Sequence, residues 1–129
     1  MEKKQLILIV EDEAPLLQAI SLKMKKEGVE TVSCTTAEQA LDYLGSINQT
    51  PDAIWLDYYL GGGMNGLEFL EKIKANKDWA DIPVLAVTNT ATEDKVQKMI
   101  GLGIMKYYVK AENTLGDMVH YAKEIITNK

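Results

Sequence analysis

Short runs of apolar residues alternate along the chain with longer segments in which apolar residues recur every three or four positions. The first run, residues 6–10, is apolar throughout, as expected for a strand buried on both faces of a sheet. The longer segments have the period of amphipathic helices. The pattern therefore predicts five strands, each followed by a helix, with the strands at residues 6–10, 29–34, 52–57, 83–88 and 104–110.

Each predicted helix gathers its apolar residues on one face. Pro15 suits a first helical turn and Gly28 a C-terminal stop, while Thr35 and Glu38 have the spacing of a capping box. Lys106, inside the last strand, indicates a sheet edge. The residues expected to face inward are Leu17, Ile20, Met24, Ala40, Leu41, Leu44, Leu67, Leu70, Ile73, Val96, Ile100, Leu115, Val119, Ala122 and Ile126.

Strands and helices that alternate in this way form a doubly wound α/β fold, a parallel sheet with helices on both faces. The length of 129 residues predicts one domain over residues 1–129. Ligands of such sheets bind outside the carboxyl ends of the strands. Candidate chemistry should therefore lie where the strands end.

The charged residues are 14 lysines and 19 acids, with no arginine, which gives a net charge of −5. Without arginine there is no bidentate fork for guanine or phosphate, and an acidic surface disfavours nucleic acid. We therefore expect no direct nucleic-acid contact. The single cysteine, Cys34, is expected to be buried and fits a reducing cytoplasm. We see no signal peptide and no apolar stretch of about 20 residues, so we expect a cytoplasmic location without membrane contact.

Four of the five predicted strands have polar residues at their carboxyl ends. Three carboxylates at one rim repel one another unless a cation lies between them. Mg²⁺ suits such a site because it takes one or two carboxylates directly and keeps several waters. A lysine and a hydroxyl beside acids and a metal are typical of phosphoryl chemistry. The residues concerned are Glu11, Asp12, Asp57, Thr88 and Lys110.

Five sequence segments occur in order, each on a successive strand–helix unit: LILIVEDE, PDAIWLD, MNGLEFL, IPVLAVT and KYYVK. Through them the chain resembles the receiver domains of two-component response regulators over essentially its whole length. It is similar to the stand-alone, chemotaxis-regulator type, without an effector domain. The resemblance implies a flavodoxin-like (βα)5 sandwich with the parallel strand order 2-1-3-4-5.

By this resemblance, Asp57 is the phosphoacceptor, which attacks phosphohistidine on a sensor histidine kinase or a histidine phosphotransfer protein. Asp57 and Asp12 would bind Mg²⁺ or Mn²⁺. Glu11 would act through water or at longer range, since the commoner residue there is Asp. The backbone carbonyl of Tyr59 would be a further metal ligand. The protein would catalyse only its own phosphoryl transfer and autodephosphorylation.

The resemblance also implies a switch. Lys110 would pair with the phosphoryl group, and the Thr88 hydroxyl would donate to a phosphoryl oxygen. Tyr107 would then turn from an exposed to a buried position, a shift between two packings. An unknown downstream protein would bind the surface of the fourth helix, fifth strand and fifth helix, which includes Lys95, Met99, Lys106 and Tyr107. The chain would be a monomer or a weak phosphorylation-dependent dimer.

The resemblance also predicts a kinase-docking surface on the first helix, around Pro15, Leu16 and Ala19. The chain departs from the family pattern after the active-site lysine, where Ala111 replaces the usual proline. This leaves open whether the Lys110–Ala111 bond is cis or trans.

A second departure follows the phosphoacceptor. The loop with glycines 61–63 is one residue longer than usual and lacks proline, which predicts a more mobile metal-side loop before phosphorylation. Asn89 replaces a small residue and would narrow access to the phosphoryl group. Tyr59 and Thr90 flank the path of hydrolytic water without offering a good acid or amide. We therefore hypothesise a long-lived phosphoform.

Other interpretations remain open. The chain could be an interaction module with a receiver fold that is not phosphorylated. It could also be a flavodoxin-like or phosphatase-like enzyme, although Tyr59 stands where an aspartate-type phosphatase has a second acid. Tyr107 could simply pack at a sheet edge, and His120 is expected to face solvent. Taken singly, the strand-end acids, Thr88 and Lys110 each have ordinary structural explanations.

Overall fold

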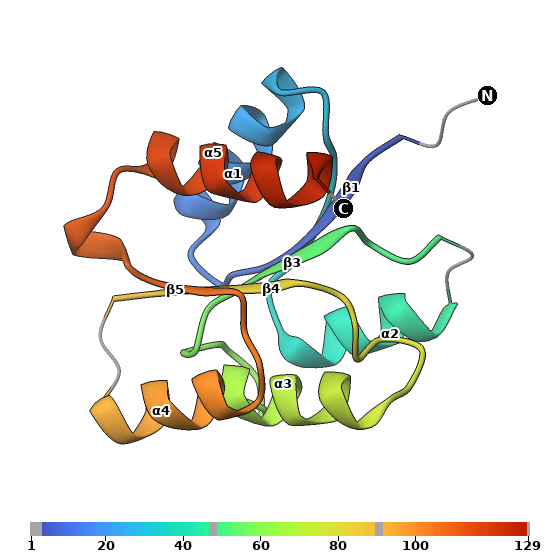
Figure 1. The fold of residues 1–129 in the computed structure, drawn as a ribbon, viewed down its shortest axis with the longest axis vertical. Helices are drawn as coiled ribbons and strands as arrows, with labels where there is room; N and C mark the ends of the chain where they lie inside the picture. The colour runs from blue at the N-terminus through green and yellow to red at the C-terminus, as the bar shows by residue number, and fades with distance from the viewer. Residues whose placement is uncertain (1–3, 47–48, 90–91, 129) are drawn as a thin grey trace.

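A computed structural model of the chain describes residues 4–46, 49–89 and 92–128. It contains one five-stranded parallel sheet with the order β2-β1-β3-β4-β5, which confirms the predicted flavodoxin-like α/β fold (Figure 1). The strands are β1 Leu6–Val10, β2 Glu30–Cys34, β3 Ala53–Leu56, β4 Val84–Thr88 and β5 Lys106–Val109.

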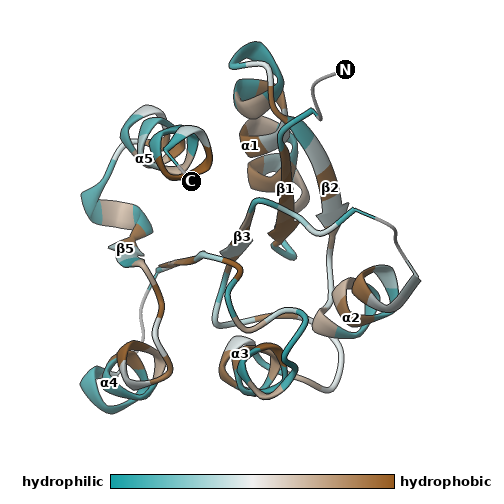
Figure 2. Cartoon of the chain, turned by 45° about the vertical axis from the view of Figure 1, so that its right-hand side comes forward, coloured by the Kyte–Doolittle hydropathy of each residue, from teal (hydrophilic) through white to brown (hydrophobic). Residues whose placement is uncertain are grey.

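Helices cover both faces of the sheet. Helices α1 and α5 lie on one face, and α2, α3 and α4 lie on the other (Figure 1). Figure 2 shows that α4 and α5 turn hydrophilic residues outward and hydrophobic residues toward the sheet. Within the described ranges, no helix has the length and apolar character needed to cross a membrane. The helices are α1 Ala14–Lys26, α2 Ala37–Ser46, α3 Gly66–Ala75, α4 Glu93–Gly101, α5 Leu115–Thr127 and the short 3₁₀ helix η1 Lys110–Glu112.

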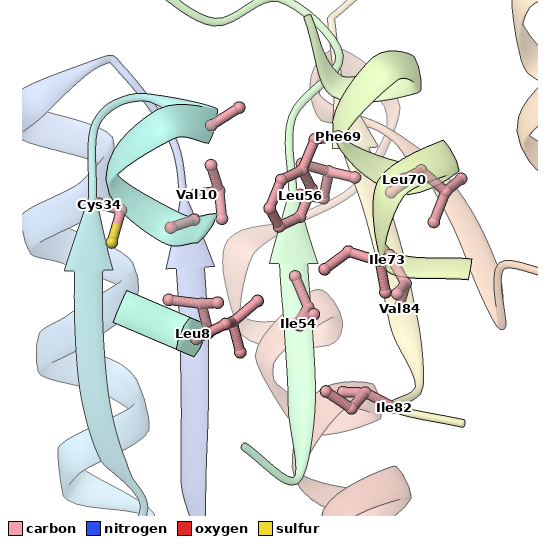
Figure 3. Packing of buried hydrophobic residues seen from close by; sticks show 14 of the residues in the cluster. Leu8, Val10, Cys34, Ile54, Leu56, Phe69, Leu70, Ile73, Ile82 and Val84 are labelled. Atoms are coloured by element: carbon pink, nitrogen blue, oxygen red, sulfur yellow. The ribbon is translucent and has the colours of Figure 1, made fainter. Parts of the chain in front are cut away.

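Two apolar clusters fill the spaces between the three layers because successive strand residues point to opposite faces. In β3, Trp55 packs in the cluster with α1 and α5, whereas its neighbours Ile54 and Leu56 pack in the cluster with α2 and α3. Figure 3 shows Phe69, Leu70 and Ile73 of α3 beside Ile54 and Leu56. All four residues of β3 are buried, as the continuous apolar run predicts.

The structure corrects two local predictions. Ile100 is 49% exposed, and Met99 is the buried residue of α4, so Met99 cannot belong to an exposed output surface. A short helix with three apolar residues allows more than one rotation about its axis, and the packing against α3 selects the face with Met99. At α2, the Thr36 hydroxyl accepts from the Gln39 amide, so the cap begins one residue later than predicted.

The strand register places the candidate residues at one edge of the sheet. Val10 of β1 pairs with Leu56 of β3, and Thr88 of β4 pairs with Val109 of β5. The residues that follow these strands therefore converge at their carboxyl ends. Strand β5 is an edge strand, as the exposed Lys106 predicted, and it ends at Val109, so that Lys110 opens η1 instead of closing the strand.

Candidate functional site

Lys110 lies at the centre of the site and contacts three carboxylates. Its Nζ lies 2.8 Å from Glu11 Oε1, 3.0 Å from Asp57 Oδ2 and 3.7 Å from Glu13 Oε1. Glu11 and Asp57 are buried, and the Lys110 side chain is 10% exposed. Since opposite charges this close favour each other's ionised forms, the lysine offsets much of the repulsion among the acids.

The chain enters η1 directly from β5, which places Lys110 beside the ends of β1 and β3. Among the described residues there is no cis peptide bond, so the Lys110–Ala111 bond is trans. Ala111 therefore takes the place of the family's usual proline with an ordinary backbone. The side-chain amide of Asn113 donates through Nδ2 to the Val109 carbonyl at 2.9 Å and holds the turn closed.

The environment shifts the pKa values of Glu11 and Lys110. Burial raises the pKa of Glu11 from 4.5 to about 6, although contacts with Lys110 and the Glu13 amide oppose the shift. Burial alone would lower the pKa of Lys110, but its hydrogen bonds to Glu11 and Asp57 outweigh burial and raise that pKa. At neutral pH the site therefore holds an ionised Glu11 beside a protonated Lys110.

Three carboxylates fit the requirements of one hard cation. Oxygen atoms of Glu11, Asp12 and Asp57 lie within 4.8 Å of one another. Asp12 is exposed, so an ion there would keep part of its water shell, as Mg²⁺ and Mn²⁺ do. No backbone hydrogen bond in the described part of the chain uses the Tyr59 carbonyl. Its role as a further ligand remains a prediction.

A small pocket of about 210 Å³ opens above Asp57. A larger hollow of about 840 Å³ lies near the start of β2 and contains none of the candidate residues. We place the site at the smaller pocket because the charged and hydroxyl groups converge there. Its walls are Asp12, Glu13, Asp57, Tyr59, Thr88, Asn89 and Lys110.

The Thr88 hydroxyl stands out in this pocket. Thr88 is fully buried, and its Oγ1 has no hydrogen-bond partner among the described residues. Buried hydroxyl groups nearly always have a partner, because leaving one unpaired costs about 1–3 kcal/mol. A donor in this state, beside Asp57 and Lys110 in one pocket, is suited to bind an anionic oxygen.

The loop after β3 is held close to Asp57. The Tyr59 amide approaches Asp57 Oδ1 at 3.3 Å, and the Gly66 amide donates to the Tyr58 carbonyl at 2.7 Å. A Cβ atom on Gly66 would overlap the Asp57 carbonyl oxygen. Gly66 is therefore required where α3 begins, a constraint that the sequence alone did not reveal.

The three glycines of the longer loop lie outside the pocket walls. Gly61 forms a single parallel bridge with Thr36 at the start of α2. Gly62 has a φ of +84°, a conformation that glycine adopts without strain. These glycines form no phosphate-binding loop, and the mobility predicted for this segment remains a prediction. Thr90, the other residue predicted to flank the water path, lies outside the described residues.

Tyr107 is half-buried in this structure, whereas the sequence suggested an exposed resting position. It packs against the cluster that contains Tyr58. Burial raises the pKa of Tyr107, and the charges of Glu112, Tyr59 and Asp57 add to this effect. The ring is therefore within electrostatic reach of the site, and its role as a switch remains a prediction.

The structure brings together the five strand-end residues that the sequence singled out, whose roles remain predictions, and it adds two contributors that we did not predict from the sequence. The five are Glu11, Asp12, Asp57, Thr88 and Lys110. Glu13, which sequence reasoning passed over, contacts Lys110 and lines the pocket. Lys95, which sequence reasoning assigned only to an output surface, has its Nζ 4.9 Å from the ring centroid of Tyr58 and 5.2 Å from that of Tyr59. The acid two residues after Glu11 was a visible signal, whereas nothing in the sequence indicated the contact of Lys95. Cys34 is buried and His120 is exposed, as predicted.

The strand order and a site at the carboxyl edge of the sheet define a flavodoxin-like, doubly wound α/β protein. Residues 7–121 match the family model described as response regulator receiver domain, and the chain therefore belongs to that family. Its members are signalling modules of two-component systems.

Individual relatives agree with this membership. The phosphate regulon transcriptional regulatory protein PhoB of Escherichia coli is 32% identical over 108 residues, which cover 81% of this chain and 44% of PhoB. The chain thus spans less than half the length of this curated relative.

Two solved structures bear on the site. The phosphorylated cyanobacterial phytochrome response regulator RcpA has a TM-score of 0.81 at 25% identity, covering 95% of this chain and 91% of RcpA. The Mn²⁺-bound form of response regulator Rcp1 has a TM-score of 0.76 at 27% identity, covering 94% of this chain and 91% of Rcp1. Receiver domains bind a divalent metal at an acidic pocket, and the acidic cluster of this chain has the matching composition.

Proposed function

We propose that this chain is a phosphorylation-activated switch that accepts a phosphoryl group on Asp57 from a histidine kinase or a histidine phosphotransfer protein. The observation that carries the proposal is the buried, unpartnered hydroxyl of Thr88 in the pocket shared by Asp57 and Lys110. An anionic phosphoryl oxygen would give this hydroxyl the partner that it lacks.

In the proposed reaction, an oxygen of the Asp57 carboxylate attacks phosphorus. A phosphorus–oxygen bond forms as the phosphorus–nitrogen bond of phosphohistidine breaks, and the histidine keeps the electron pair. Lys110 Nζ, which lies 3.0 Å from Asp57 Oδ2 in the resting structure, would pair with the incoming phosphoryl oxygens. Mg²⁺ held by Glu11, Asp12 and Asp57 would supply further neutralisation of the developing negative charge.

The phosphoryl group would then change the outer surface. Hydrogen bonding of Thr88 to phosphate would draw β4 and the following loop inward, and Tyr107 would follow into a more buried packing. The affected surface comprises α4, β5 and α5, with Lys95, Lys106 and Tyr107 among its residues. The charge of the phosphoryl group on Asp57 would thereby favour one of two packings of the α4–β5–α5 surface.

We further propose that residues 1–129 act as one receiver module, in the cytoplasm, as a monomer or a weak phosphorylation-dependent dimer. The partner that reads the switch is a downstream protein. The matched relatives include proteins named as DNA-binding response regulators, but those chains are much longer. The acidic charge of this chain supports a protein partner in place of direct nucleic-acid contact.

The test uses the full chain with Mg²⁺ and acetyl phosphate, followed by intact mass measurement. We expect one phosphoryl adduct on the wild type and none on Asp57→Asn. Asp42→Asn is the matched control, since Asp42 is an exposed acid of α2 away from the pocket. Chelation of the metal should abolish the adduct on all variants.

The opposite outcome is equally definite. If neither acetyl phosphate nor a panel of histidine kinases modifies the wild type, the chain is a receiver-fold interaction module that is not phosphorylated. An adduct that survives Asp57→Asn would place the acceptor elsewhere. Turnover of a phosphoester would instead indicate an enzyme.

A further inference from the structure

Lys95 of helix α4 contacts the loop that follows Asp57. Lys95 lies in the first turn of α4, and its ammonium group lies over the rings of both Tyr58 and Tyr59. Its Nζ is also 3.5 Å from the Tyr59 hydroxyl. Within the part of the chain that the structure describes, no carboxylate lies within ion-pair distance of Lys95, whereas Lys98 on the same helix pairs with Asp94 at 3.3 Å.

The two tyrosines differ in how firmly they are held. Tyr58 is buried, and its ring packs edge-on against that of Tyr59 with centroids 4.9 Å apart. Tyr59 is 45% exposed and forms part of the pocket wall beside Asp57. A side chain that is this exposed has several rotamers available. The contact with Lys95 is therefore one of the few interactions that fix where the Tyr59 ring lies.

The position of this ring matters for hydrolysis. Loss of the phosphoryl group requires water to attack phosphorus while the bond from phosphorus to the Asp57 oxygen breaks. The products are the free carboxylate and inorganic phosphate, which takes the proton from water. A ring held in the pocket wall restricts the approach of that water, whereas a ring that rotates away opens it.

We propose that Lys95 is a positioning residue that holds Tyr59 in the pocket wall by cation–π contact and thereby lengthens the lifetime of the phosphoform. This inference rests on the proposed function, because it concerns the lifetime of phosphate on Asp57. Lys95 contacts neither the reacting atoms nor the acidic cluster, and it acts only through Tyr59. It also makes that lifetime depend on where α4 lies.

The first test measures the decay of phosphorylated protein by intact mass after the donor is removed. We expect Lys95→Met to shorten the lifetime about two- to five-fold, the factor that corresponds to loss of one partly exposed cation–π contact. Lys95→Arg, which keeps a cation over the rings, should restore most of the lifetime. Lys98→Met, the matched control on the same helix, should leave it unchanged.

The double variant decides whether Lys95 acts through Tyr59. Tyr59→Leu should shorten the lifetime, and adding Lys95→Met to it should produce no further change, since contacting residues are not additive. Factors that multiply in the double variant would overturn the inference. So would a Lys95→Met lifetime equal to that of the wild type.

A second readout needs no phosphorylation. In NMR spectra of the resting protein, the Lys95 Cε protons should lie upfield of those of Lys98 because they sit over two rings, and should move back in Tyr59→Leu. If the Cε protons of Lys95 had the same chemical shifts as those of Lys98, the inference about Lys95 would be overturned and the proposed function would be unaffected. Failure of the wild type to take up phosphate would overturn the proposed function and this inference together, so the two failures are distinguishable.

Discussion

Two lysines from different elements contact residues at the end of β3, and different kinds of interaction hold them there. Lys110, after β5, lies among three carboxylates, two of them buried. Lys95, on α4, lies over two aromatic rings and next to a phenol. Both are cations in contact with the residues around Asp57, yet only Lys110 neutralises buried negative charge.

The two kinds of contact differ in how much they contribute to stability. Removing one partner of a buried ion pair typically costs about 3–5 kcal/mol, whereas a cation–π contact at a partly exposed site contributes about 0.5–1 kcal/mol. Lys110 should therefore determine whether the acidic site is stable at all. Lys95 should adjust the position of one side chain and leave the fold intact.

The largest expected effect comes from Lys110→Met. This change leaves Glu11 and Asp57 buried without a cation, so the free energy of unfolding at pH 7.5 should fall by about 3 kcal/mol. Urea denaturation measures it, with Lys98→Met as the exposed control. Equal stabilities of the two variants would break the comparison, because Lys110 would then carry no more than a surface charge.

The pH dependence of the free energy of unfolding also reports on the buried acids around Lys110. The pKa of Glu11 is raised from 4.5 to about 6 in the folded state, so the folded protein binds this proton more tightly than the unfolded chain. The contribution of protonated Glu11 to the free energy of unfolding is fully present below pH 4.5 and is lost as pH rises through about 6. The loss should be about 2 kcal/mol, from about 1.4 kcal/mol per pKa unit.

Glu11→Gln isolates this contribution from those of the other acids. In metal-free buffer, the difference in unfolding free energy between wild type and Glu11→Gln should change by that amount between pH 4.5 and pH 7. A constant difference across this range would contradict the raised pKa. It would also show that Lys110 compensates the buried charge fully.

The Thr88→Val variant tests whether the Thr88 hydroxyl is unpaired in the resting protein. Since a buried hydroxyl without a partner destabilises the fold, this variant should be more stable than wild type by about 1 kcal/mol in urea denaturation. The same change should weaken retention of the phosphoryl group. Thr31→Val is the control, because the Thr31 hydroxyl is bonded to Ser21 at 2.8 Å and its loss should lower stability.

The smallest effect is expected at the other lysine. Lys95→Met should change the free energy of unfolding by less than about 1 kcal/mol, although it should shorten the lifetime of the phosphoform. Thermal and urea unfolding beside Lys98→Met provide the measurement. A loss as large as that of Lys110→Met would show that α4 depends on this contact for its folding.

The pattern of apolar residues predicted the parallel sheet, because strands buried on both faces, such as β1 and β3, are continuous apolar runs. The strand order was predicted from the family resemblance and not from this pattern. The pattern was weaker for α4, where Met99 and Ile100 are both apolar and only packing selects between them. The cap of α2 was misplaced by one residue because Thr35 and Thr36 are neighbours with the same side chain.

The site could be predicted from the sequence wherever strand ends supply its residues. Glu11, Asp57 and Lys110 directly follow three strands of a parallel sheet, and Thr88 is the last residue of a fourth. These four strands are adjacent in the sheet, so topology alone brings the residues together. The contact of Lys95 with two tyrosines depends on the rotation of α4 and on the path of the loop after β3. Neither is encoded in local periodicity.

Gly61 and Gly66 differ in whether they can be replaced by a residue with a side chain. Gly61 has open space where a side chain would begin, so this part of the loop can accept substitution or carry an inserted spectroscopic label. Gly66 can accept neither, because any side chain there would displace the backbone that presents Asp57. Within the conspicuous run of glycines, Gly61 is thus the position that tolerates a side chain, whereas Gly62 has a positive φ and would bring a Cβ atom to 2.9 Å from Glu38 Oε1. The solitary Gly66, three residues after the run, cannot be replaced without moving the backbone.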